Sequence, residues 1–276
     1  MRKYYAVVMF LVLALFIAGC GNKEESIWQE IQDSGEMVVG TSGTLIAASF
    51  YNDDNELTGY DVEVMKEVGK RLDIDVEFDI MGIDSMLPGI KSGRIHAAVN
   101  DIEITPNRSK EFNFSDPYKY SYTTMAVRKG DNSGIESLED LEGKKAGGGA
   151  TTIYSQIAEQ FGAKVVTYGN APNEAYLRDV HDAETDVVIN DYYLTKFGVA
   201  AFPDFDIHLH PTLKFHPTEQ GVILPKDEDE LTEKINEVLD EMREDGTLKE
   251  LAEQFYEEDA SVKPKGDIVE VEGLDL

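Results

Sequence analysis

Residues 100–118 read N-D-I-E-I-T-P-N-R-S-K-E-F-N-F-S-D-P-Y and follow the apolar run A-A-V at 97–99. The apolar run predicts a strand that ends in polar residues, and the following T-P-N-R predicts the start of a short helix. Thr105 can cap this helix with its hydroxyl, and Pro106 suits its first position. Backbone N–H groups at a helix start favour negative charge, and the Arg108 guanidinium can hold a carboxylate through two hydrogen bonds. The segment therefore predicts an anion site; a capped helix with Arg108 in a surface ion pair is the alternative.

The same succession of a short apolar strand and an amphipathic helix recurs along the chain. Strands are expected at 37–40, 74–78, 97–99, 145–147, 186–189 and 221–225, and helices at 60–72, 84–92, 151–161, 171–180, 231–242 and 247–256. This alternation predicts an α/β fold with mainly parallel sheets flanked by helices. The length suits two domains of about 100–150 residues each. The turn-rich K-G-D-N-S-G at 129–134 marks a crossing between them.

The first residues have the order of a secretory signal. Arg2 and Lys3 precede an uncharged stretch that closes with I-A-G-C at 17–20. This ending resembles the lipobox of bacterial lipoproteins, in which the chain is cut before the cysteine and the cysteine receives a diacylglycerol with palmitate-type chains. The resemblance implies a lipoprotein signal peptide at 1–19, lipid on Cys20 and a polar tether at 20–35. Cys20 is the one cysteine of the chain, so a disulfide within one molecule is impossible.

The charge balance excludes whole classes of partner. The chain carries 25 lysine and arginine residues against 54 aspartate and glutamate residues, a net charge of −29. A chain this acidic is not expected to bind nucleic acid, or anionic lipid headgroups through a basic patch. The acidic surface could steer cationic ligands, or it could be a solvated coat suited to a salty environment. With 42% hydrophobic residues the chain is globular.

Several short motifs occur in a characteristic order. They are G-T at 40–41, L-T-G-Y-D-V-E at 57–63, I-T-P-N-R at 104–108, F-S-D-P-Y at 114–118, S-L-E-D-L-E-G-K at 137–144, A-T-T at 150–152 and D-G-T-L at 245–248. Together they resemble the amino-acid-binding lipoproteins of ABC importers, the solute-binding family 3 group, over roughly residues 35–256. The resemblance implies a two-lobed type II periplasmic-binding-protein fold with a ligand cleft between the lobes. Lobe 1 would comprise 36–123 and 219–258, lobe 2 would comprise 124–218, and 259–276 would be a C-terminal tail.

The resemblance also implies roles for single residues. In such relatives the arginine of T-x-x-R, here Arg108, and backbone N–H groups at the paired threonines, here Thr151 and Thr152, hold the ligand's carboxylate. The acid after the late strand, here Asp191, takes the ligand's ammonium. An arginine and a helix start suit an anion, and an aspartate in a partly dry cleft suits a cation. The alternative for Asp191 is a helix N-cap, and one residue can do both.

Four further residues complete the expected binding set. Ser42 lies in the polar loop after the first strand, Asp101 follows the strand at 97–99, and Tyr154 is a candidate cleft aromatic together with Phe50, Tyr51 and Tyr192. Core packing is the alternative for these aromatics. Glu103 departs from the small residue that relatives often carry there. Three interpretations are open. The Glu103 side chain points away from the cleft, it binds a second cationic group of the ligand, or the ligand is not a plain neutral amino acid.

Another departure concerns the expected ring platform of the cleft. Leu45 and Ile83 occupy the positions nearest to the aromatic residues that many relatives carry. The usual ring platform is therefore missing.

The leading hypothesis is a non-enzymatic receptor, a monomer without cofactors. It would sit on the extracytoplasmic face of a bacterial cell membrane and deliver a small, polar amino acid or related zwitterion, cystine-like or cationic, to an ABC permease. The chain lacks a G-x-x-x-x-G-K-[ST] loop, so ATP hydrolysis would belong to the permease's partner ATPase.

Two other hypotheses remain open. The same fold resembles secreted cyclohexadienyl or arogenate dehydratases, in which Glu103 could act as a general acid. The H-x-H at His208 and His210, with His216, could bind a metal, although a surface loop explains it as well.

Overall fold

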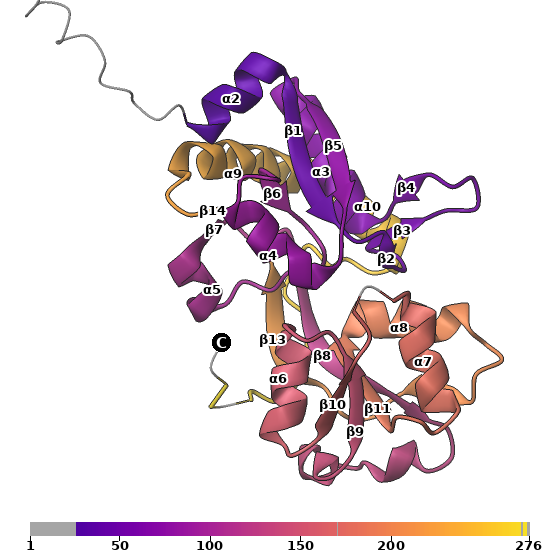
Figure 1. Ribbon diagram of the computed structural model, residues 1–276. Helices are drawn as coiled ribbons and strands as arrows, with labels where there is room; N and C mark the ends of the chain where they lie inside the picture. The colour runs from indigo at the N-terminus through magenta and orange to yellow at the C-terminus, as the bar shows by residue number, and fades with distance from the viewer. Residues whose placement is uncertain (1–25, 170, 272, 275–276) are drawn as a thin grey trace, which may run out of the picture.

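The computed structural model describes residues 26–169, 171–271 and 273–274. The expected signal peptide, Cys20 and the first part of the expected tether, residues 20–25, lie outside the described residues, whereas 27–34 of that tether form a helix in which Trp28 and Ile31 are buried. Figure 1 shows two lobes, each with a sheet flanked by helices. The expected two-lobed α/β architecture is therefore confirmed. In the described part of the chain, no helix combines the length and the apolarity that a membrane crossing needs.

The first lobe contains a five-stranded sheet in which β1 (Glu36–Thr41) is parallel to both neighbours, β5 (Asp75–Ile80) and β6 (Ala97–Ala98). Two antiparallel connections complete it, through β14 (Ile223–Pro225) and β7 (Phe112–Phe114). The helices of this lobe are α2 (Ile27–Ser34), α3 (Tyr60–Leu72), α4 (Ile83–Lys91), α5 (Pro106–Glu111), α9 (Asp229–Glu244) and α10 (Thr247–Tyr256). The apolar faces of α2, α3, α9 and α10 share one buried cluster with the central strands, and α4 packs in a second cluster with β6 and β14.

A small sheet at the start of α3 fixes how that helix enters the fold. It consists of β2 (Thr44–Leu45), β3 (Ser49–Tyr51) and β4 (Leu57–Thr58). Gly59, the helix cap, has φ +121°, and a Cβ there would lie 2.3 Å from the carbonyl oxygen of Ala48. A glycine is needed because the helix start approaches the loop backbone so closely.

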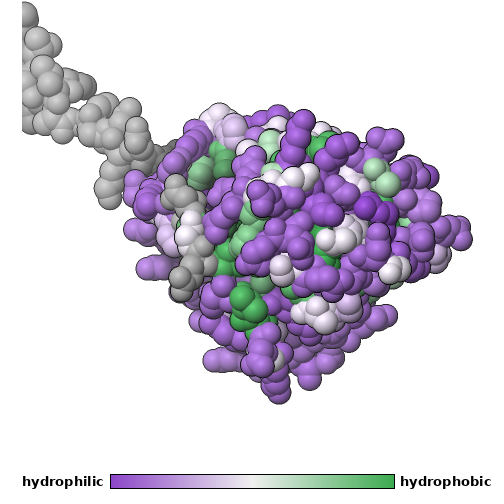
Figure 2. All heavy atoms as spheres, turned by 90° about the horizontal axis from the view of Figure 1, so that it is seen from below, coloured by the Kyte–Doolittle hydropathy of each residue, from purple (hydrophilic) through white to green (hydrophobic). Residues whose placement is uncertain are grey.

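The second lobe contains a six-stranded sheet with β10 (Lys164–Thr167), β9 (Lys145–Gly148) and β11 (Val187–Asp191) in parallel. Antiparallel strands continue it, namely β8 (Lys119–Arg128), β12 (Ile207–Leu209) and β13 (Phe215–Gln220). The helices are α6 (Ile153–Gln160), α7 (Asn173–His181) and α8 (Tyr192–Ala201), with short 3-10 turns η1 (Asn132–Gly134) and η2 (Leu138–Leu141). Figure 2, seen from below, shows mostly hydrophilic side chains, with hydrophobic ones scattered between them.

The long strands β8 and β13 run between the two lobes side by side (Figure 1). Their pairing extends from Lys119↔Gln220 to Thr123↔Phe215, with a bulge at His216. The limits expected between the lobes, 123/124 and 218/219, lie inside these two strands. An antiparallel pair of this kind is suited to act as a hinge.

The segment expected as a tail contacts both lobes. Tyr120 N donates to Ala260 O at 2.8 Å, and further along Val269 pairs in parallel with Phe215 of β13. Val271 and Leu274 then pack against the apolar cluster of the second lobe. The segment is therefore held by backbone hydrogen bonds at Val269 and by the side chains of Val271 and Leu274.

Candidate ligand-binding site

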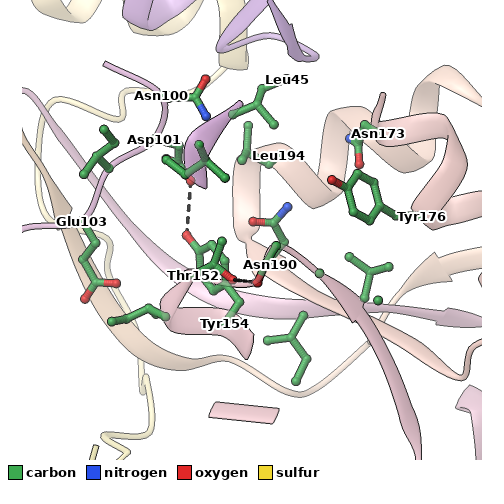
Figure 3. A pocket seen from close by; sticks show the side chains of 18 of the residues that line it. Leu45, Asn100, Asp101, Glu103, Thr152, Tyr154, Asn173, Tyr176, Asn190 and Leu194 are labelled. Carbon is green, nitrogen blue, oxygen red and sulfur yellow. Dashed lines mark hydrogen bonds between the residues drawn. The ribbon is translucent and has the colours of Figure 1, made fainter. Parts of the chain in front are cut away.

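A cavity of about 110 Å³ lies between the lobes. The first lobe contributes Leu45, Ile83, Asn100, Asp101, Ile102, Glu103 and Arg108, and the second contributes Gly147–Gly149, Thr152–Tyr154, Asn173, Tyr176, Val188–Asn190 and Leu194. Figure 3 shows side chains from both lobes facing one another across this space. Most polar lining residues follow a strand end or start a helix, as the sequence led us to expect.

Arg108 lies where the capped helix start predicted it. The Thr105 hydroxyl accepts from the Arg108 N–H at 3.2 Å, and Pro106 is the first residue of α5. The guanidinium donates to Glu103 O at 2.9 Å and, across the cleft, to Thr151 O at 3.4 Å. Burial lowers its pKa and the nearby Glu103 carboxylate raises it, but an arginine stays protonated. Both of these acceptors are backbone carbonyl groups, so a carboxylate of the ligand would be the natural counter-ion of the guanidinium.

Thr151 and Thr152 stand at the start of α6. Thr152 is the N-cap, and its hydroxyl accepts from Ser155 N at 3.2 Å. The Thr151 hydroxyl instead donates to Asp84 Oδ1 in the first lobe at 2.7 Å. Thr152 lines the cavity. Thr151 lies at the exposed edge of the cavity, where its hydrogen bond to Asp84 connects the two lobes.

Asp101 lines the opposite side of the cavity and is held from three directions. Its backbone N–H, at a residue with φ +54°, donates to Asp61 Oδ2 at 2.6 Å. Its Oδ1 accepts from Lys119 Nζ at 2.5 Å, and its Oδ2 accepts from the Tyr154 hydroxyl at 3.2 Å (Figure 3). Burial, and then Asp191, raise the pKa of Asp101 well above its usual value. Tyr154 therefore closes the cleft over a carboxylate of the other lobe.

Asp191 is fully buried, and the residue before it, Asn190, lines the cavity. Asp191 Oδ1 accepts from the backbone N–H groups of Tyr193 and Leu194 at 2.8 and 3.1 Å, so it caps α8. The same oxygen accepts from Lys119 Nζ at 3.0 Å. The capping alternative is therefore the one that the structure displays, and the expected role toward a ligand ammonium stays a prediction.

Ser42 supports the site through its backbone. Its N–H donates to Asn100 Oδ1 at 3.0 Å, while its hydroxyl oxygen accepts from Thr44 Oγ1 at 3.0 Å. Asn100 lines the cavity, so Ser42 orients a lining side chain.

Glu103 is buried and pairs with His216 of β13, Oε1 lying 2.8 Å from Nε2. Its backbone bridges Gln220 of the same strand. Of the three interpretations of Glu103, the structure thus shows a carboxylate turned toward a partner in the protein.

The aromatic and aliphatic candidates divide between the cavity, the edge of the core and the surface. Leu45, Ile83 and Tyr154 line the cavity, and Tyr176 joins them. Tyr51 is 45% exposed, and Tyr192 stacks on Tyr122 with ring centroids 4.7 Å apart.

The three histidines have separate hydrogen-bond partners. His208 Nε2 lies 2.9 Å from Asn132 Oδ1 and His210 Nε2 lies 2.9 Å from Ile135 O, while His216 pairs with Glu103. Across the described ranges, no three or more His, Cys, Asp or Glu side chains are grouped so that they could hold a metal ion.

Sequence reasoning missed Lys119 altogether and named His216 as a possible metal ligand but not as the partner of Glu103; each of the two residues joins segments far apart in the chain. Lys119 is the one charged residue in the run Y-K-Y-S-Y-T-T-M-A-V at 118–127, and this isolation was an available signal. His216 lies at a strand bulge with φ +47°, which no local motif announced.

The sequence model of bacterial extracellular solute-binding proteins, family 3, matches residues 37–258. Among curated proteins, the chain is 47% identical over 278 residues to the probable ABC transporter extracellular-binding protein YckB of Bacillus subtilis, covering 97% of each chain. It is 30% identical to the L-cystine-binding protein TcyJ of Escherichia coli, covering 92% of this chain and 96% of that one. Among solved structures, the ancestral amino acid-binding protein AncCDT-1, a precursor of cyclohexadienyl dehydratase, is 28% identical with a TM-score of 0.75, covering 84% and 100%.

Proposed function

The chain belongs to the bacterial extracellular solute-binding proteins of family 3, and we propose that it binds a small amino acid or related zwitterion and delivers it to an ABC importer. The observation that carries the proposal is the cavity between the lobes, in which Arg108 and the start of α6 face the carboxylate of Asp101. An anion site and a cation site in one small cavity match the two ends of a zwitterion.

The ligand carboxylate is proposed to bind Arg108 and the backbone N–H groups at Thr151 and Thr152. The ligand ammonium is proposed to bind at the acidic side, formed by Asp101 and Tyr154 with Asp191 beyond them. Ser42 contributes by orienting Asn100. Closure of the lobes over the ligand would use β8 and β13 as the hinge.

The proposed ligand is polar, cystine-like or cationic. Two observations support this class. TcyJ is named an L-cystine-binding protein, and the buried acids at and behind the cavity wall, Asp61, Asp101 and Asp191, outnumber the Lys119 ammonium that lies among them. A ligand with an ammonium group near Asp101 would reduce this excess of negative charge.

The cellular setting is proposed from the first residues of the sequence. Cleavage before Cys20 and lipid attachment to that cysteine would tether the receptor as a monomer to the extracytoplasmic face of the membrane, beside its permease and ATPase. Mass spectrometry of the protein from membranes tests this: an acylated N-terminal Cys20 is expected, and an unmodified cysteine in a soluble protein would contradict it.

A thermal-shift screen of amino acids and compatible solutes, including cystine, arginine and glutamine, tests the binding function. A ligand that binds the folded state alone raises the melting temperature. We expect one or a few polar amino acids to do so at submillimolar concentration. A flat response across the whole set would contradict the proposal.

The dehydratase alternative would need Glu103 to donate a proton to a bound substrate. Glu103 Oε1 lies instead against His216. We expect purified protein to leave prephenate and arogenate unchanged, and turnover of either would reverse this conclusion.

A further inference from the structure

Lys119, the first residue of β8, is fully buried between carboxylates of the two lobes. Its Nζ lies 2.5 Å from Asp101 Oδ1, which follows β6 in the first lobe, and 3.0 Å from Asp191 Oδ1, which ends β11 in the second. The rings of Tyr193 and Tyr256 lie 5.4 and 5.1 Å from the same nitrogen. Two carboxylates and two aromatic faces form a complete site for a primary ammonium group.

The charge of this cluster is unbalanced. Asp61, Asp101 and Asp191 are all buried around Lys119. Burial alone would lower the pKa of Lys119, but the three carboxylates raise it, so the lysine is charged. Burial raises the pKa of Asp61 to about 6 even though the Lys119 ammonium acts in the opposite direction. One internal cation therefore serves three acids, and removing it would leave buried acids that either carry unpaired charge or must take up protons.

We propose that Asp101 and Asp191 form a primary-ammonium site that Lys119 fills from within the chain. The cationic group of the ligand then binds at the cavity face of Asp101, beside Tyr154, and does not reach Asp191. This last step rests on the proposed function. It follows from exposure: Asp101 lines the cavity, whereas Asp191 is fully buried and does not line it.

The acid pair affects which ligands bind, because the Lys119 ammonium that fills the site is part of the chain and cannot dissociate. The Lys119 side chain is tethered to the chain and offers one positive charge to the acid pair, so the cavity need accept just one further cationic group near Asp101. Without the lysine side chain, a small free amine could enter the space and make the same contacts.

The experiment is melting of the Lys119→Ala variant with methylammonium chloride titrated at constant ionic strength. Methylammonium should raise the melting temperature of Lys119→Ala by about 3 °C or more, since it binds the folded state alone. Wild-type protein and Lys249→Ala, which removes an exposed lysine, should not respond. Tetramethylammonium, which lacks N–H donors, serves as the chemical control. Equal responses of Lys119→Ala to both amines, or none, would overturn the ammonium site.

Should Lys119→Ala fail to fold, refolding yield replaces the melting curve. The yield should then rise with methylammonium and not with tetramethylammonium, and equal yields would overturn the proposal.

A second experiment measures how the loss of the Lys119 side chain changes the affinity for the ligand. By calorimetry, Lys119→Ala should bind the wild-type ligand about tenfold more weakly, with part of the loss restored by methylammonium. Unchanged affinity would contradict the specificity role. A wild-type protein that binds no amino acid would refute the proposed function instead, and the amine-dependent melting would still decide the ammonium site.

Discussion

The Glu103 carboxylate and the His216 imidazole face each other at 2.8 Å, Oε1 to Nε2, and both side chains are buried. The pair joins the cavity wall of the first lobe to the hinge strand β13. The bulge of β13 and the φ of +47° at His216 direct the ring toward Glu103. The docked segment at 268–271 adds support, since His216 N donates to Val269 O at 2.7 Å.

Replacing His216 by leucine should lower the free energy of unfolding by about 2 kcal/mol, because the Glu103 carboxylate is left buried without this partner. The double variant with Glu103→Leu should recover part of that loss in urea unfolding. His208→Leu, whose partner Asn132 is on the surface, is the matched control. Additive costs of the two single changes would show that the pair is not coupled.

Asp61→Asn should gain stability relative to wild type as the pH rises. Burial raises the pKa of Asp61 from 3.8 to about 6. Between these values the unfolded chain releases the proton while the folded protein keeps it, so the wild-type free energy of unfolding falls as pH rises through this window. The variant lacks this loss, which amounts to about 3 kcal/mol. Urea unfolding at pH 4 and pH 7 measures it, with the exposed Asp53→Asn as control. A stability difference that does not change with pH would exclude this cause.

Gly59→Ala should destabilise the protein by at least about 2 kcal/mol, because φ is positive and the new Cβ would clash with backbone. Gly93→Ala is the control, since its φ is +72° but nothing lies within 4 Å of the added Cβ. Its cost should be about 1 kcal/mol. Equal melting temperatures for the two variants would mean that the approach to Ala48 imposes no constraint.

Val269→Pro tests the docking of the C-terminal segment. Val269 N donates to Lys214 O at 3.1 Å, and proline removes this donor. We expect a loss of about 1 kcal/mol in the free energy of unfolding. Val269→Ala keeps the N–H, and its 61% exposed side chain should matter little. If proline and alanine act alike, the backbone pairing does not contribute.

The sequence predicted what depends on neighbours in the chain. The cap at Thr105, the position of Arg108 and the strand–helix alternation all have local patterns, and the structure displays each of them. The N-cap alternative for Asp191 was local as well.

The missed features join residues that are distant in sequence. Lys119 meets Asp191 across 72 positions, and His216 meets Glu103 across 113. A charge pair of this kind has no spacing that a single sequence reveals. The docked segment at 268–271 was missed because the glycines around it suggested a loose tail, and its pairing with Phe215 is an isolated bridge between residues distant in sequence.

Calorimetric titration of the Arg108→Ala variant with the ligand found in the screen tests whether Arg108 holds the ligand carboxylate. We expect affinity to fall at least about 30-fold, because a buried charge–carboxylate contact is lost. The melting temperature without ligand should change little. Arg108→Lys should keep part of the affinity, and Arg94→Ala, an exposed arginine paired with Asp79, should keep all of it. Undiminished binding by a folded Arg108→Ala would contradict the assignment of the carboxylate site and the account built on it.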